Sequence, residues 1–387
     1  MTGFAEVSLL LALAAGGLVG SVCAAPPPKL NIDEASVLRE GAPGISFAPV
    51  VKKVSSSVVN IYTTKTVRAD PRLYRLFEDP VFRKFFGDTY GLDQVPRERR
   101  EQSLGSGVIV SQDGYILTNN HVVQGADEVK VALADEKTVL DAKIVGTDSH
   151  TDVAVIKVDG QNLAAITLTN SDQLEVGDVV LAIGDPFGVG QTVTMGIVSA
   201  KDRGMGMVDY EDFIQTDASI NPGNSGGALV DANGRLAGIN TAILSRSGGN
   251  QGIGFAIPVN LARSVMEHII VEGKVKRGYL GVKILALTPA LAGQLNLPGQ
   301  TGALVGDVTA NSPGERAGLK KGDIVIAFDG KDVTDGRHLR LMVAEKAPGS
   351  KVSIKILRDG KEQMLTAELG ELPSTETALQ PGVPDDK

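Results

Sequence analysis

Short hydrophobic runs separated by turn residues dominate the chain from about residue 46 to residue 260. The runs are apolar throughout or alternate apolar and polar positions, and glycine, aspartate or asparagine recurs between them roughly every ten residues. Examples are residues 108–110, 115–117, 129–133, 153–158 and 179–183. Asp113-Gly114, which separates two of these runs, is a strong hairpin signal. The pattern predicts a mostly β domain, built as a barrel or a sandwich.

A helical period replaces this pattern at residues 259–273. Leu261, Val265, Ile269 and Ile270 fall on one face, and Gly273 is a helix stop signal. We assign residues 261–277 to a helical linker between two domains.

A smaller domain is predicted at residues 278–370. Its short strands alternate with glycine and aspartate turns, and residues 337–344 read as a short helix. The Pro-rich, polar tail at 371–387 is expected to be disordered.

An insert at residues 68–103 interrupts the β pattern. It is rich in aromatic residues, arginine and glutamate, and Phe82, Phe85 and Phe86 lie at helical spacing. A short amphipathic helix packed on its own barrel explains this spacing. A long regulatory or oligomer-contact loop explains it equally well.

The N-terminal residues 1–25 contain an apolar, uncharged run that ends in Cys23, Ala24 and Ala25. An apolar run ending in small residues is typical of a secretory signal peptide, although no lysine or arginine precedes it. A retained membrane anchor is the alternative. Residues 26–45, Pro-rich and polar, are predicted to be a linker.

Composition argues against several kinds of binding and catalytic site. The net charge of −8 gives no support to a nucleic-acid-binding surface. Cys23 is the one cysteine in the sequence, so a mature protein without the N-terminal run has no disulfide, metal thiolate or cysteine nucleophile. No metal or nucleotide motif is found, and we expect no cofactor.

Ser225, in the string G-N-S-G-G at 223–227, is the candidate nucleophile. The flanking glycines let the backbone turn sharply and let a substrate approach. The backbone N–H groups of Gly223 and Ser225 are the expected oxyanion hole.

His121 follows a predicted strand, and Asp152 begins one. A buried carboxylate needs a partner, and an imidazole N–H can provide it, which fixes the histidine tautomer. Alternative roles remain for each residue, because Asp152 could cap a strand and Ser225 could be a turn residue. His150 is the one rival base, whereas His268 and His338 are expected to be surface or packing residues.

The same string satisfies G-x-S-x-G, the nucleophile elbow of α/β-hydrolases. That fold requires a helix after the serine, but a strand is predicted at 228–230. The order His, Asp, Ser is that of chymotrypsin-like double barrels.

Five strings together resemble the bacterial HtrA (Deg) proteases over roughly residues 45–370. They are G-S-G-V-I-V at 105–110, T-N-N-H-V-V at 118–123, T-D-V-A-V-I-K-V at 151–158, Q-T-D-A-S-I-N-P-G-N-S-G-G-A-L-V at 215–230 and G-I-G-F-A-I-P at 252–258. The resemblance implies a chymotrypsin-like double β-barrel at 46–260 followed by an α+β PDZ domain. It also implies an exported periplasmic or cell-envelope enzyme of protein quality control and stress response, built on trimers.

The resemblance assigns the triad to His121, Asp152 and Ser225. It assigns the oxyanion loop to Gly223, Asn224 and Ser225. Because Asn224 is uncharged, it cannot pair with a newly cut N-terminus, so activation by propeptide cleavage is not expected.

Further roles follow from the resemblance alone. Arg203 resembles the sensor arginine of a regulatory loop, although the loop here is one residue shorter and a solvated charge is the alternative. Ile220, Ile253, Gly254 and Phe255 match the specificity-pocket wall. With no acid there, cleavage after small aliphatic residues is expected.

The C-terminal strings R-G-Y-L-G-V at 277–282 and N-S-P-G-E-R-A-G-L-K-K-G-D-I-V at 311–325 resemble a PDZ module. Tyr279, Leu280, Gly281 and Val282 match its carboxylate-binding loop, which would hold a peptide C-terminus by strand addition.

Two functions are consistent with these sequence features. The first is a serine endopeptidase that acts on unfolded or damaged proteins without nucleotide. The second is a non-proteolytic PDZ chaperone or scaffold with a dormant barrel.

Overall fold

The computed structural model describes residues 28–34, 46–68, 98–135, 137–185, 190–221, 223–243, 251–285, 287, 293 and 301–373. The predicted N-terminal signal or anchor, residues 69–97 of the predicted insert with Phe82, Phe85 and Phe86, and the tail after residue 373 lie outside these residues. The two ends of the insert, residue 68 and residues 98–103, lie in strands. Within the described ranges, no helix is both long and apolar enough to cross a membrane.

Six strands close the first barrel in the order β1-β2-β3-β6-β5-β4. These strands are β1 (Val58–Arg68), β2 (Glu98–Ile109), β3 (Tyr115–Asn119), β4 (Glu128–Ala132), β5 (Val139–Asp148) and β6 (Val153–Val158). The predicted Asp113-Gly114 turn joins β2 to β3: Gly114 has φ +102°, and the Val110 N–H donates to the Tyr115 carbonyl at 2.9 Å.

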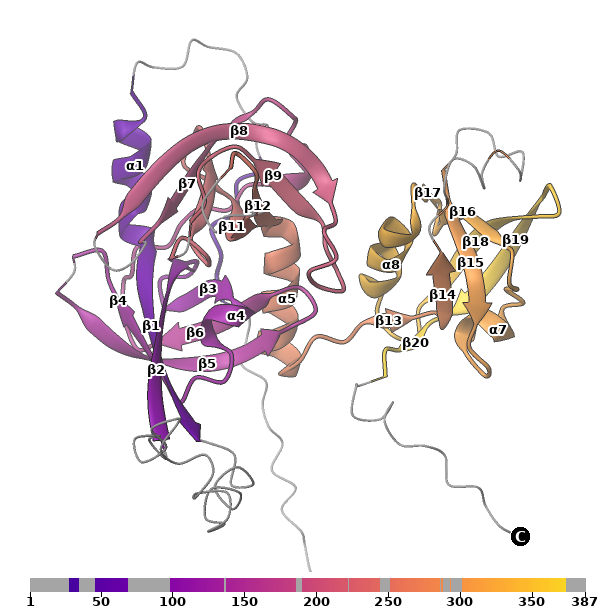
Figure 1. The fold of residues 1–387 in the computed structure, drawn as a ribbon, viewed down its shortest axis with the longest axis horizontal. Helices are drawn as coiled ribbons and strands as arrows, with labels where there is room; N and C mark the ends of the chain where they lie inside the picture. Colours follow the sequence, from indigo (N-terminus) through magenta and orange to yellow (C-terminus); the bar gives the residue numbers. More distant parts are fainter. Residues whose placement is uncertain are drawn as a thin grey trace, which may run out of the picture.

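A second closed barrel has the order β10-β11-β12-β9-β8-β7. These strands are β7 (Val179–Gly184), β8 (Thr192–Arg203), β9 (Phe213–Thr216), β10 (Ala228–Asp231), β11 (Leu236–Ile243) and β12 (Gly254–Pro258). The two barrels lie against each other (Figure 1), which confirms the predicted double barrel.

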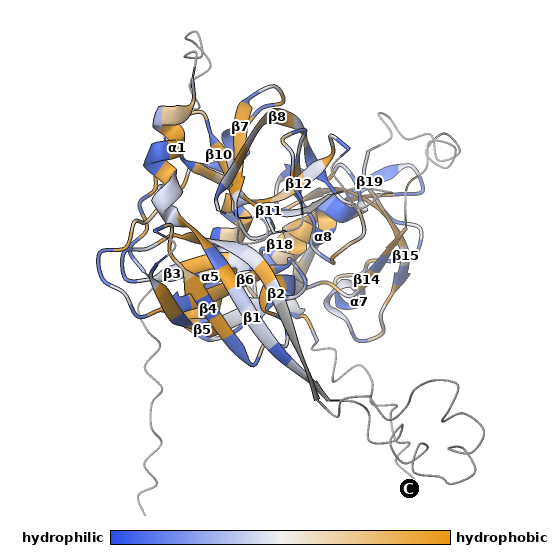
Figure 2. Cartoon of the chain, turned by 60° about the vertical axis from the view of Figure 1, so that its left-hand side comes forward, coloured by the Kyte–Doolittle hydropathy of each residue, from blue (hydrophilic) through white to orange (hydrophobic). Residues whose placement is uncertain are grey.

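One apolar core joins the two barrels. It combines first-barrel residues such as Leu117 and Val155 with second-barrel residues such as Ile183 and Phe255. Figure 2 shows hydrophobic residues on the barrel strands and on α5, the helix at Val259–Glu272. The described residues also form α1 (Ala48–Val54), α4 (Asn120–Val123), α7 (Pro313–Arg316) and α8 (Gly336–Ala344), with the 3-10 turns η1 (Ser55–Ser57) and η3 (Ser171–Gln173).

The helix predicted at residues 259–273 is confirmed as α5. Val265, Ile269 and Ile270 are buried in the core, and the helix ends at Gly273, whose φ of +73° suits glycine. A Cβ at Gly146 on β5 would lie 2.6 Å from Ile269, so glycine there permits the close approach of helix and barrel.

The C-terminal domain contains the sheet β14-β15-β16-β18-β19, with β17 paired to β16 and β13 paired to β20. Its strands are β13 (Gly278–Tyr279), β14 (Val282–Leu285), β15 (Ala303–Val308), β16 (Ile324–Phe328), β17 (Lys331–Asp332), β18 (Lys351–Arg358), β19 (Lys361–Glu368) and β20 (Gly370–Glu371). Helix α8 packs on this sheet through Leu339, Met342 and Val343. The predicted short helix is thereby confirmed.

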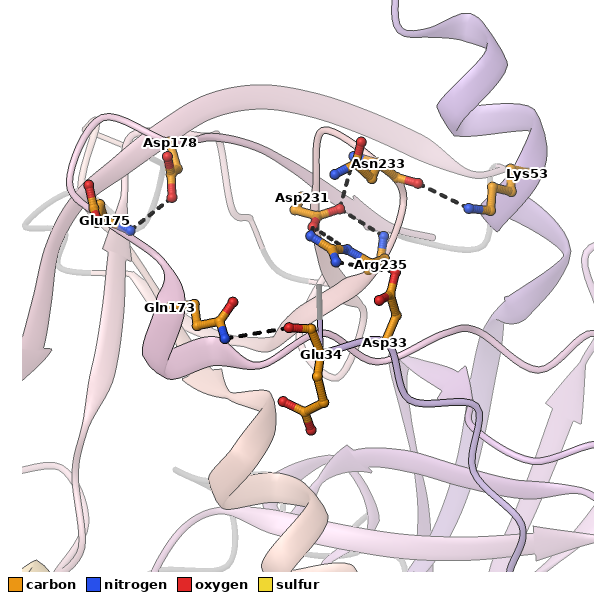
Figure 3. A network of polar contacts seen from close by, with 9 residues as sticks. All are labelled: Asp33, Glu34, Lys53, Gln173, Glu175, Asp178, Asp231, Asn233 and Arg235. Carbon is orange, nitrogen blue, oxygen red and sulfur yellow. Dashed lines mark hydrogen bonds and ion pairs between the residues drawn. The ribbon is translucent and has the colours of Figure 1, made fainter. Parts of the chain in front are cut away.

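The described part of the N-terminal stretch is fastened to the second barrel rather than free of it. The Asp33 N–H donates to the Leu168 carbonyl at 3.0 Å. Arg235, whose side chain is 4% exposed, binds Asp231 at 2.8 Å and Asp33 at 3.3 Å (Figure 3). Because Asp231 is fully buried, this pairing compensates the cost of burying its charge.

Arginines connect the C-terminal domain and its linker to the barrels. Arg337 of α8 donates to the Glu211 carbonyl at 2.8 Å and contacts Asp212 at 3.1 Å. Arg277 forms a buried ion pair with Asp148 and lies over the Tyr210 ring, 4.6 Å from its centre. Burial raises the pKa of the Tyr210 phenol, which therefore stays neutral at ordinary pH.

Candidate active site

His121 and Asp152 meet where the first barrel faces the second. His121 lies in α4, directly after β3, and Asp152 directly precedes β6, which pairs with β3. The His121 Nδ1 atom lies 2.7 Å from Asp152 Oδ2, and the His121 backbone N–H donates to Oδ1 at 3.0 Å. These two contacts fix the position of the carboxylate and leave the other ring nitrogen, Nε2, for proton transfer.

The backbone of Asp152 is strained, with φ +60°. A left-handed conformation is uncommon outside glycine, although aspartate tolerates it better than most residues. The Asp152 carbonyl accepts from the Asn120 N–H at 3.0 Å and from the Asn119 side chain at 3.1 Å. These bonds hold the turn that points the carboxylate at His121.

Ser225 lies in a tight turn of the second barrel between Gly223 (φ +99°) and Gly226 (φ +82°). A Cβ at Gly226 would lie 2.1 Å from the Ser106 carbonyl oxygen of β2, which explains the glycine. Ser106 also donates its N–H to the Ser225 carbonyl at 2.8 Å and its Oγ to the Gly223 carbonyl at 2.7 Å. The first barrel thus fixes the loop that the second barrel carries.

Thr241 of β11 joins the two halves of the site. Its Oγ1 donates to Asp152 Oδ2 at 2.8 Å, and its carbonyl accepts from Ser225 Oγ at 3.1 Å. Among the described contacts, Ser225 Oγ makes this bond and none to His121. Proton transfer to His121 requires Ser225 Oγ to give up this bond. Catalytic hydrogen bonds are often long or poorly aligned before substrate binds.

Thr241 is not among the site residues predicted from the sequence. It is one of several threonines in β strands, and no local motif distinguishes it. Its role follows from the register of β11 against the Ser225 turn, where the Asn240 carbonyl accepts from the Gly226 N–H at 2.8 Å.

Replacing Thr241 by valine is expected to lower kcat about tenfold, because one hydrogen bond to the Asp152 carboxylate is worth about 1.5 kcal/mol. The measurement is steady-state peptide hydrolysis, with thermal unfolding as a check on folding. Thr366→Val, on the exposed face of β19, is the matched control. An unchanged kcat in Thr241→Val would remove Thr241 from the site.

Some backbone N–H groups of the Ser225 turn donate a hydrogen bond, and others have no acceptor among the described residues. The Asn224 N–H donates to the Asn221 carbonyl at 3.0 Å. In the described part of the chain, the N–H groups of Gly223 and Ser225 have no acceptor. The Asn224 side chain is buried, 1% exposed, and carries no charge.

The residues predicted to form the specificity pocket separate into two groups. Ile220 and Gly254 are in contact, since a Cβ at Gly254 would lie 2.9 Å from Ile220 Cδ1. Phe255 instead packs in the core against Phe213, with 5.9 Å between ring centres. Ile253 is half-buried beside that core.

The remaining candidates have other partners. Arg203, at the end of β8, donates to Gln215 Oε1 at 3.2 Å. His150 Nδ1 lies 2.6 Å from Asp209, and its ring packs edge-on against Tyr210. His268 contacts the Ser264 carbonyl of its own helix, and His338 contacts Thr334. No cluster of three or more metal-ligating side chains occurs among the residues that were described.

Two backbone N–H groups in the loop before β14 have no hydrogen-bond acceptor among the described residues. The carbonyls of Leu280 and Gly281 accept from Gly314 at 2.7 Å and Thr309 at 2.8 Å, while neither residue's own N–H has an acceptor in the described ranges. Gly281 has φ +75°, and a Cβ there would lie 2.2 Å from Ser312. Beside the loop lies a groove of about 490 Å³. Its lining comprises Tyr210, Gly278, Tyr279, Leu280, Gly281, Val282, Lys283, Ile284, Thr309, Leu339, Arg340, Val343 and Leu372.

Comparison with known proteins matches both domains. Residues 105–239 match the family described as the trypsin-like peptidase domain, and residues 278–369 match the PDZ domain. A Hahella chejuensis protein named "Probable periplasmic serine endoprotease DegP-like" is 45% identical over 350 residues, which cover 88% of this chain and 74% of the relative.

Solved structures agree with this match. The structure titled "HtrA-type protease AlgW with decapeptide" is 53% identical, with a TM-score of 0.68, and the match covers 85% of this chain and 100% of that one. The structure titled "HtrA-type protease AlgW with tripeptide" is 49% identical, with a TM-score of 0.70, and covers 86% and 99%. With its double barrel and its PDZ domain, the chain belongs to the HtrA family of serine endoproteases.

Proposed function

We propose that the chain cleaves unfolded or damaged polypeptides with Ser225 as nucleophile, His121 as base and Asp152 as the residue that orients His121. The contact of 2.7 Å between His121 Nδ1 and the half-buried carboxylate of Asp152 is the observation that carries this proposal. Likeness to serine endoproteases along both domains favours this function over a scaffold with a dormant barrel.

In the proposed reaction, Ser225 Oγ attacks the scissile carbonyl carbon while His121 Nε2 takes its proton. The carbonyl π electrons move to the oxygen, and the N–H groups of Gly223 and Ser225 stabilise that oxyanion. His121 then gives the proton to the leaving amine, which leaves an acyl-enzyme. Water, deprotonated by His121, hydrolyses this ester and restores Ser225.

Three further roles are proposed around this chemistry. Asn224 supports the oxyanion loop through its buried, uncharged side chain. Ile220 and Gly254, with Ile253, form an apolar pocket that takes a small aliphatic side chain of the substrate, and Phe255 supports it from the core. Arg203 is proposed to be a regulatory residue, and its side chain donates a hydrogen bond to Gln215.

The PDZ domain is proposed to bind peptide C-termini. The N–H groups of Leu280 and Gly281, which have no acceptor among the described residues, support capture of a carboxylate, as in strand-addition modules generally. Tyr279 and Val282 flank these donors and line the adjoining groove.

Location and assembly are also proposed. Relatives named as periplasmic support action in the periplasm or cell envelope, with residues 1–25 as the export signal or a membrane anchor. We further propose domain limits of 46–260 and 278–370, and a trimer or a multiple of trimers.

The test of this function is digestion of an unfolded protein. Purified chain is expected to degrade casein without nucleotide, and to degrade a stable folded protein only after that protein is denatured. Equal rates on the folded and denatured forms would contradict selection of unfolded chains. Absence of cleavage on both, with and without peptides that have a hydrophobic C-terminus, would favour the scaffold function.

A further inference from the structure

The charged residues that line the PDZ groove are cationic, whereas the chain as a whole is acidic. The formal net charge of the whole chain is −8. Among the residues that line the groove, however, Lys283 and Arg340 are cationic and none is acidic. An extended peptide seated there would meet positive charge along its length, in addition to the donors for its terminal carboxylate.

Strand β14 determines which peptide side chains meet this charge. It is the terminal strand of its sheet, so its outer edge faces the groove. Val282 and Ile284 are half-buried, whereas Lys283 and Leu285 are exposed. Ile284 faces helix α8, since a Cβ at Gly336 would lie 2.3 Å from its Cγ2 atom. Lys283 therefore projects from the opposite, solvent-facing side of the strand.

A peptide added to β14 alternates in the same way. Its last side chain would enter the apolar space between β14 and α8, next to Leu280, Leu339 and Val343. Its penultimate side chain would then point to the solvent-facing side, where Lys283 stands. Neighbouring strands place such side chains about 5 Å apart, within reach of an ion pair.

Lys283 is available for that contact. The residue opposite it in register on β15 is Asp307. Asp307 Oδ1 accepts from the Val308 N–H at 3.0 Å, and no ion pair of Lys283 occurs among the described residues. The ammonium group can therefore bridge Asp307 and an acid on the incoming strand.

Arg340 supplies the second cation from the helix side. It is held toward the barrels by a bond of 3.3 Å to the Asp209 carbonyl, so its charge lies at the rim near Tyr210. That position adds to the attraction for an acidic peptide without contacting the penultimate side chain directly.

We propose that the PDZ groove selects C-terminal peptides with an acidic penultimate residue, and that Lys283 forms an ion pair with the carboxylate of this residue. The proposal rests on the proposed function of the groove as a C-terminus binder. It adds a specificity that neither the carboxylate loop nor the apolar pocket provides, because both of these contact only the last residue.

The test compares three labelled decapeptide acids that differ only at the penultimate position and end in Glu-Val, Gln-Val or Lys-Val. A fourth peptide, Glu-Val as the C-terminal amide, tests the need for the terminal carboxylate. Binding is measured by fluorescence anisotropy to the full-length Ser225→Ala variant, which prevents cleavage. The Glu-Val acid is expected to bind about threefold more tightly than Gln-Val and about tenfold more tightly than Lys-Val. Raising the salt concentration should reduce both ratios.

Lys283→Glu is expected to reverse the order, so that Lys-Val binds more tightly than Glu-Val. Lys321→Glu makes the same charge change at an exposed site outside the groove and should leave the order unchanged. Equal binding of the three acids, or an order that survives Lys283→Glu, overturns the proposal alone. Equal binding of acid and amide, or no binding of any peptide, overturns the C-terminus-binding function and this proposal with it.

Discussion

Replacement of Ser225 by alanine is expected to lower kcat for peptide hydrolysis by about 10⁶, the scale seen when a serine nucleophile is removed. The physical reason is the loss of the covalent step, since alanine cannot attack the carbonyl carbon. Folding should survive, because the Ser225 side chain makes one described bond, to the Thr241 carbonyl, and the turn is fixed by its backbone. Stopped assays on a fluorogenic peptide measure the rate, and thermal unfolding measures stability.

Ser350→Ala is the matched control for this experiment. Ser350 lies in a turn of the PDZ domain, outside the barrels, and should keep full activity. Casein digestion by Ser225→Ala at more than a few per cent of the wild-type rate would mean that another residue is the nucleophile.

Asp152→Asn is expected to lower kcat by about 10⁴ with little change in KM. An asparagine amide cannot stabilise the imidazolium, and it favours the wrong tautomer of His121. The substitution suits the backbone, because asparagine also tolerates the φ of +60° found here. The loss should therefore come from chemistry and not from unfolding.

Asp141→Asn gives the comparison for Asp152→Asn. The Asp141 side chain is 91% exposed and lies 3.8 Å from Lys130, so its removal should change neither kcat nor stability measurably. A loss of less than tenfold in Asp152→Asn would show that His121 is oriented by other contacts.

Sequence patterns predicted the elements that local signals define. Helix α5 ends at Gly273 because glycine adopts φ +73° without the strain that most side chains would bring, and Asp113-Gly114 forms the turn expected of that pair. The apolar face of α5 was likewise visible in its period. In each case a few residues close together in the sequence are enough to predict the element.

Contacts between distant strands could not be predicted in this way. Ser106 and Thr241 are ordinary strand residues, and they support the candidate site only because β2 and β11 pass beside the Ser225 turn. Similarly, nothing near Phe255 distinguishes a pocket wall from a core residue, yet its ring packs on Phe213. Barrel register decides these contacts, and register depends on the entire sheet.

The most direct measurement of the central claim is the site of covalent labelling by a fluorophosphonate. The reagent forms a bond to an activated serine oxygen and expels fluoride, so one adduct per chain is expected, mapped by mass spectrometry to Ser225. Labelling should fall sharply in His121→Ala, since the base that takes the serine proton is gone. An adduct on another serine, or undiminished labelling of Ser225 without His121, would contradict the account.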